Sequence, residues 1–206
     1  KDKTYLYVAP NLGLVADNAL YGSTGPINGG RSSYTAEQAF GDVSYTTLMM
    51  DWRHYANIHH SYAFAQRFIA GSSFGRDPKR FRFGGAFTFR GVDYGDLKGS
   101  NALLGNLEFR FPLIEQLRFG WPGRISLGGI NGVLFLDAAS AWQKGQKPRF
   151  FTTDGGFHAN DILFAFGAGA RVNLGYFILR YDFGRRTDFQ RTAHGSHHFV
   201  TLGADF

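Results

Sequence analysis

The chain has 206 residues, a formal net charge of +6 and no cysteine, which excludes disulfides, thiolate catalysis and cysteine-ligated zinc. No apolar run approaches the ~20 residues of a transmembrane helix, which excludes a helical membrane protein but not a membrane β-barrel. Its arginines stand singly rather than in runs or basic helices, so the positive charge does not indicate nucleic-acid binding.

The first part of the chain predicts four β-strands, because apolar and polar residues alternate there with a period of two. The first strand runs roughly from Thr4 to Val15. Residues 17–30 are rich in glycine, proline and asparagine and are expected to form turns. The other three strands are expected at residues 31–40, 43–54 and 62–71.

A long connection follows the fourth strand and is centred on residues 83–94, FGGAFTFRGVDY. Loops of ~25 residues are uncommon in compact domains and are usually functional or disordered. The aromatic side chains argue against disorder, because disordered segments are poor in them. We therefore expect an ordered loop with a function and with Arg90, next to Gly91, at its tip.

Five further strands are expected after this loop, and their alternation is sharper than in the first four. One face of each strand is rich in phenylalanine and leucine, as Leu107, Phe109 and Phe111 illustrate. The opposite face holds arginine, acidic residues, asparagine and glycine, with hardly a lysine. The five strands are expected at residues 103–113, 125–142, 162–173, 177–183 and 197–206.

Alternation alone also fits a soluble β-sandwich with one wet face. The polar face described above nevertheless resembles a confined interior whose charges pair with one another. The apolar face, with tyrosine and tryptophan near strand ends, is typical of a surface that contacts lipid. The pattern therefore favours a transmembrane β-barrel over a soluble β domain.

Seven motifs follow one another along the second part of the chain. They are FRFGG (81–85), FTFRGVDYGDLKGS (87–100), GNLEFRFPL (105–113), FLDAA (135–139), GAGAR (167–171), LRYDFG (179–184) and the terminal LGADF (202–206). Together they resemble the outer-membrane insertase superfamily, also called the Omp-eighty-five superfamily or bacterial surface-antigen domain. Its members include the Bam-complex insertase, the Tam translocation barrel and the two-partner-secretion pores. The resemblance is generic before Tyr62.

This resemblance implies an all-β, antiparallel, 16-stranded transmembrane barrel in which the loop folds back into the lumen. It implies that Arg90 meets Asp137, with Glu108 nearby, since a guanidinium in a narrow polar lumen needs carboxylate partners. Ala139 stands where the family usually has glycine, so a methyl group lies where the loop packs. The expected site comprises the loop motif Gly84, Gly85, Arg90 and Gly91, the acids Asp137 and Glu108, the supporting charges Arg110, Arg171, Arg180 and Asp182, and the terminal assembly signal Leu202 and Phe206.

The strand count departs from the family, because about nine strands are expected where the barrel has 16. Single-chain bacterial barrels have even strand numbers and place both chain ends in the periplasm. If Phe206 ends in the periplasm, nine strands leave Lys1 outside. Residues 1–206 are therefore expected to be one domain, the C-terminal part of a larger barrel. The alternative is an autonomous eight-stranded barrel in which residues 4–15 do not span the membrane.

The resemblance implies a non-enzymatic protein of the Gram-negative outer membrane that aids insertion or translocation of polypeptides. The implied partners are the lipid bilayer and lipopolysaccharide, substrate polypeptides, the outer-membrane assembly machinery and the missing N-terminal half or a second chain, with no nucleic acid and no cofactor. Two alternatives stay open: a barrel that anchors or exports a fused domain, and a hydrolase barrel. A metal site in residues 194–198, HGSHH, is not expected, because His197 and His198 are neighbours on a strand and point to opposite faces.

Overall fold

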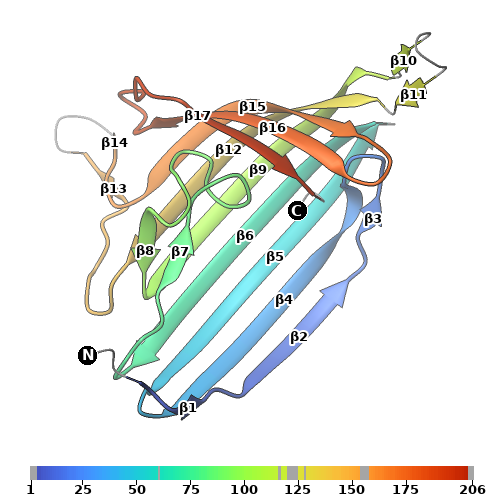
Figure 1. Cartoon of the computed structure of the whole chain (residues 1–206). Coiled ribbons are helices and arrows are strands. Elements are labelled where there is room, and N and C mark those ends of the chain that lie inside the picture. The colour runs from blue at the N-terminus through green and yellow to red at the C-terminus, as the bar shows by residue number, and fades with distance from the viewer. Residues whose placement is uncertain are drawn as a thin grey trace.

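The computed structural model describes residues 4–59, 61–115, 117–119, 125–127, 129–153 and 158–203. They form an all-β molecule built on one large antiparallel sheet that curls around a concave inner face (Figure 1). No helix in this part of the chain is long and apolar enough to cross a membrane. The strands are β1 (Tyr7–Val8), β2 (Asn11–Asp17), β3 (Leu20–Tyr21), β4 (Pro26–Gly41), β5 (Tyr45–His59), β6 (Tyr62–Gly75), β7 (Phe81–Phe83), β8 (Leu97–Gly99), β9 (Asn101–Ile114), β10 (Leu117–Phe119), β11 (Ile125–Leu127), β12 (Ile130–Trp142), β13 (Phe151–Thr152), β14 (His158–Ala159), β15 (Leu163–Asn173), β16 (Ile178–Thr187) and β17 (His197–Leu202).

The main sheet follows the order of the chain. The short strands β1, β2 and β3 all pair with β4, so they form one interrupted strand at the first edge. The remaining strands run β4-β5-β6-β9-β12-β15-β16-β17. This gives nine strand positions, four before the long loop and five after it, which confirms the expected count. Among the described residues β17 does not pair with β1–β3, so the sheet is open.

The expected turn at residues 17–30 is wrong in its extent. The chain reverses only at residues 22–25, where the Gly22 amide donates to the Gly25 carbonyl at 2.8 Å. The glycine-rich residues that follow belong to β4. They serve close pairing rather than a turn, because a Cβ at Gly30 would lie 2.7 Å from the Arg53 carbonyl oxygen of β5.

Other strand boundaries also differ from the sequence pattern. The strand expected at residues 125–142 is interrupted, since β11 ends at Leu127 and pairs with β10 instead of continuing β12. Strands β5, β6 and β16 extend farther than expected, because each continues pairing with its neighbour beyond the alternating stretch. Alternation reports which face a residue occupies, whereas strand length is decided by the neighbouring strand.

The two faces of the sheet differ as the alternation predicts. Large apolar side chains such as Leu134, which is 50% exposed, cover the outer face. The inner face instead carries buried charged residues, with Glu108 and Asp137 among them. A sheet whose apolar face is open while its charges are enclosed is suited to lipid outside and a polar lumen inside.

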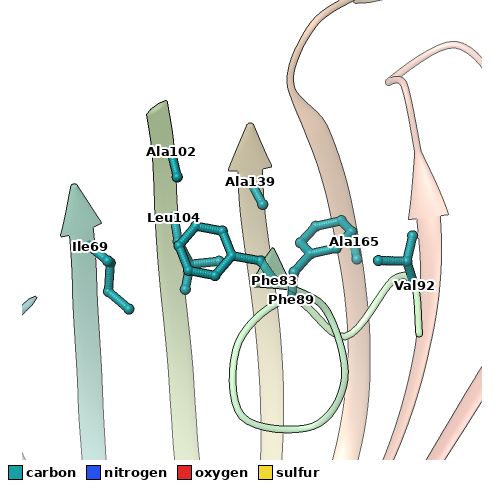
Figure 2. Packing of buried hydrophobic residues seen from close by; sticks show 8 residues of the cluster. All are labelled: Ile69, Phe83, Phe89, Val92, Ala102, Leu104, Ala139 and Ala165. Atoms are coloured by element: carbon teal, nitrogen blue, oxygen red, sulfur yellow. The ribbon is translucent and has the colours of Figure 1, made fainter. Parts of the chain in front are cut away.

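The long loop between β6 and β9 lies inside the curl of the sheet (Figure 1). Its base is the short β7–β8 hairpin, and its apolar side chains pack on the inner wall (Figure 2). The wall beneath them is made largely of alanines, which leave room for the phenyl rings. Ala139 takes part in this packing, so its methyl group is accommodated. The cluster consists of Phe83, Phe89 and Val92 from the loop and Ile69, Ala102, Leu104, Ala139 and Ala165 from the wall.

Candidate functional site

Glycines and a threonine give the loop its local shape. Gly84 and Gly85 have φ angles of +128° and +79°, a region in which glycine is strongly preferred. A Cβ at Gly84 would lie 2.0 Å from the Asp93 carbonyl oxygen, so the two arms of the loop meet only because that atom is missing. The Thr88 hydroxyl donates to the Gly84 carbonyl at 2.7 Å and accepts from the Gly84 amide at 2.9 Å. These contacts close the turn that precedes Arg90.

Arg90 is the centre of the site and is 1% exposed. Its Nε and Nη2 donate to the two carboxylate oxygens of Asp137 at 2.8 and 2.7 Å, and its backbone amide donates to the same carboxylate at 3.1 Å. Nη1 donates to Glu108 Oε1 at 2.5 Å. The guanidinium carbon also lies 3.6 Å from the centre of the Phe135 ring. A planar guanidinium makes such a two-point contact, which a lysine ammonium cannot make.

The protonation of Arg90 follows from this environment. Burial by itself lowers the pKa of Arg90, but the Asp137 and Glu108 carboxylates outweigh it and hold the pKa above its ordinary value. The side chain therefore stays charged at every physiological pH.

Two glycines allow the loop to approach the wall at Arg90. A Cβ at Gly184 in β16 would lie 2.3 Å from the Arg90 carbonyl oxygen. A Cβ at Gly91 would lie 2.9 Å from the Ala165 Cβ and 2.8 Å from the Arg186 Cγ. Both positions therefore need glycine because the backbone of the loop lies against strands β15 and β16.

The supporting charges surround this centre. Glu108 Oε2 accepts from Arg110 Nε and Nη2 at 3.0 and 2.8 Å. Asp182 lies 2.9 Å from Arg171 Nη1 and 3.5 Å from Arg180 Nη2. Glu108 with Arg110 and Asp182 with Arg180 are pairs two residues apart on one strand, whereas Arg171 and Asp182 pair across β15 and β16. Asp182 thereby offsets the two arginines that the register places opposite each other, Arg171 and Arg180. Every one of these side chains is buried.

Two residues that sequence reasoning did not single out also hold the loop. Asn106 Nδ2 donates to the Thr88 carbonyl at 2.7 Å and to Asp137 Oδ1 at 2.8 Å. Arg67 Nη1 donates to the Phe87 carbonyl at 2.9 Å, and its Nη2 donates to Asp51 at 2.8 Å. Both occupy inward positions of the alternation, but only strand pairing reveals that Arg67, Asn106 and Asp137 form one row across β6, β9 and β12.

The expected assembly signal lies at the other edge of the sheet. Leu202 is an exposed, outward residue of β17, and Phe206 lies outside the described residues. His197 and His198 point to opposite faces, as expected. His197 Nδ1 lies 3.5 Å from the Asp93 carboxylate of the loop, whereas His198 Nδ1 lies 2.8 Å from the Tyr181 hydroxyl. The loop therefore also contacts the last described strand.

The arrangement holds the loop in place through buried ion pairs. Glu108, Asp137 and Asp182 each contact at least one arginine, so their charges are balanced within the network. Buried hydrogen-bonded ion pairs of this kind fix the position and orientation of the loop.

Comparison with known proteins gives one family. The Omp85 superfamily domain matches residues 16–206, which include all strands from β3 to β17. The search of the curated proteins found no match. The family match agrees with the open antiparallel sheet, the inward-folded loop and the sequence motifs. The chain therefore belongs to the Omp85 superfamily.

Proposed function

We propose that this chain is the C-terminal part of a Gram-negative outer-membrane barrel that assists insertion or translocation of polypeptides. Residues 1–206 form one domain of it, and the remaining strands come from an N-terminal half or from a second chain. Its surroundings are the lipid bilayer with lipopolysaccharide, and its working partners are substrate polypeptides and the outer-membrane assembly machinery.

The observation that supports this proposal is that the fixed loop contacts β17, a strand with an edge that is unpaired in the described part of the chain. Strand β17 pairs through six residues with β16, and within the described residues its other side has no strand partner. Such an edge offers backbone N–H and C=O groups to an incoming strand. The loop reaches β17 through Asp93 and His197, and it is fixed to β9 and β12 through Arg90.

The proposed mechanism is templating. An incoming strand pairs with the exposed edge of β17, and the loop holds this edge in position from inside the lumen. The loop braces the edge because its own position is fixed by the buried Arg90 contacts. Substrate recognition through backbone groups requires no particular side-chain sequence, only an extended segment.

Liposome reconstitution of the full natural protein tests the proposal. An outer-membrane barrel unfolded in urea is diluted into these liposomes, into empty ones and into ones that hold a closed porin of similar size. We expect faster folding of the substrate only with the wild-type protein. The Arg90→Ala variant is expected to lose most of that gain. Equal folding rates in all three kinds of liposome would favour a barrel that only anchors or exports a fused domain.

A further inference from the structure

A second segment is folded into the lumen, at the end of the sheet opposite to the long loop (Figure 1). This segment, residues 22–26, joins β3 to β4 and is called the inner turn here. Ser23 is exposed, but Thr24 is only 8% exposed and Gly25 and Pro26 are buried. Turns at the ends of strands normally face solvent, because their backbone groups need partners. The buried side of the inner turn therefore needs partners within the protein.

Those partners come from distant strands. The inner turn begins β4, whereas its partners belong to β9, β12 and β15, which lie three to five positions away in the sheet. The turn must therefore reach across the concave face. The contacts are Arg110 Nη1 to the Pro26 carbonyl at 2.9 Å, Asn131 Nδ2 to the Thr24 hydroxyl at 2.5 Å, and Asn173 Nδ2 to the Ser23 carbonyl.

One carboxylate joins the inner turn to the long loop. Glu108 accepts from Arg90 through Oε1 and from Arg110 through Oε2, and Arg110 in turn donates to Pro26. Glu108 is fully buried. The contacts therefore run without a gap from the loop, through one carboxylate and one guanidinium, to the turn at the other end of the lumen.

We propose that the inner turn closes the far end of the lumen and that its position is coupled to the long loop through Glu108 and Arg110. When the loop is displaced or Arg90 is substituted, the buried Glu108 carboxylate loses a charged partner. It then interacts more strongly with the remaining cations. Arg110 is the nearest of them, and Arg171 lies 4.0 Å away. As Arg110 shifts toward the carboxylate, its contact with Pro26 weakens and the inner turn is released. The coupling is reciprocal, so losing the turn also loosens the loop.

Engineered cysteines test this placement and coupling, since the chain contains no cysteine of its own. Thr24→Cys and Asn131→Cys are introduced together into the full protein in membranes, and the rate of their cross-linking under a mild oxidant is measured. The two side chains touch in the structure, so we expect rapid cross-linking. Adding Arg90→Ala should slow cross-linking by at least about fivefold, the lower end of ordinary coupling between sites.

Arg67→Ala is the matched control. Arg67 also holds the loop, at the Phe87 carbonyl, but its carboxylate partner is Asp51 and not Glu108. Asp51 pairs with Ser33 of β4, seven residues beyond Pro26. We expect Arg67→Ala to leave the cross-linking rate unchanged.

Absence of cross-linking in the otherwise wild-type protein would overturn the placement of the inner turn. Equal slowing by Arg90→Ala and Arg67→Ala would overturn the route through Glu108. If Arg90→Ala fails to show heat-modifiable gel mobility, Arg90→Lys replaces it, because it keeps the charge and loses the two-point contact. None of these outcomes depends on insertase activity.

Discussion

Arg90 contacts acids of two different strands while it belongs to neither, so one side chain determines where the loop lies relative to β9 and β12. Exposed ion pairs contribute only ~0–1 kcal/mol, because water screens them. A buried pair behaves differently, since removing one partner leaves the other charge without compensation. The main energetic effect of removing Arg90 is therefore that buried carboxylates lose their charged partner.

Replacing Arg90 by alanine is expected to release the loop while the strands remain paired. The free energy that holds the loop in place is expected to fall by ~3–5 kcal/mol, because Asp137 stays buried without its main partner. The Arg90→Ala/Asp137→Ala double variant should recover part of either single loss, since neither charge is then left alone. Arg90→Lys should rescue only partly. Protease access to residues 83–95 is measured for these three variants and for Asp137→Ala. Strictly additive effects of the two alanine substitutions would show that the two side chains act independently.

At the scale of one element, the loop is held by shape as well as by charge. Its phenyl rings pack on Ile69, Leu104 and three alanines of the wall (Figure 2). Its backbone approaches β16 at Gly184. Apolar packing of this kind is sensitive to single methyl groups, because protein interiors are close-packed. Two pairs of substitutions, one at glycines and one at phenylalanines, test the effect of packing without changing any charge.

Gly184→Ala is expected to displace the loop, because its methyl group would lie 2.3 Å from the Arg90 carbonyl oxygen. The matched control is Gly105→Ala in β9, where nothing lies within 4 Å of an added Cβ. Thermal unfolding in detergent and protease access to the loop compare the two. The prediction fails if both variants resemble the wild type or if both lose the loop equally.

Phe89→Ala is expected to loosen the loop far more than Phe87→Ala, although both residues lie in the same segment. Phe89 is 0% exposed and packs in the cluster, whereas Phe87 is 48% exposed. Loss of a buried phenyl group typically costs ~3–5 kcal/mol, and little packing is lost at an exposed position. Protease access to residues 83–95 follows the release of the loop in both variants. Similar access in the two variants would mean that the cluster does not hold the loop.

At the scale of the whole molecule, the outer face determines where the protein resides. Exposed leucines, phenylalanines and valines cover strands on both sides of the long loop. We expect the full protein to partition into membranes or detergent and to change its gel mobility on heating, as membrane barrels do. Extraction of a monomer into neutral buffer without detergent would contradict the membrane assignment.

The sequence predicts the strand count, the two faces and the inward loop with its Arg90 partners, but not how strands are aligned. Alternation with a period of two assigns a residue to a face, and a resemblance supplies known pairs such as Arg90 with Asp137. The row formed by Arg67, Asn106 and Asp137 depends on register between three strands, which local pattern does not contain. The inner turn was missed for the same reason, since its partners lie 84 to 150 residues away in the chain.

The direction of the two edge strands sets a rule for whatever completes the sheet. Strand β2 at one edge and β17 at the other occupy the first and ninth positions of an antiparallel series, so both run the same way. Direct pairing between them would be parallel, whereas every pairing within the main sheet is antiparallel. An inserted set with an odd number of strands matches both edges in the antiparallel sense, and an even set leaves one parallel junction, the less stable kind. Strand polarity thus selects, among all possible complements, those with an odd number of strands.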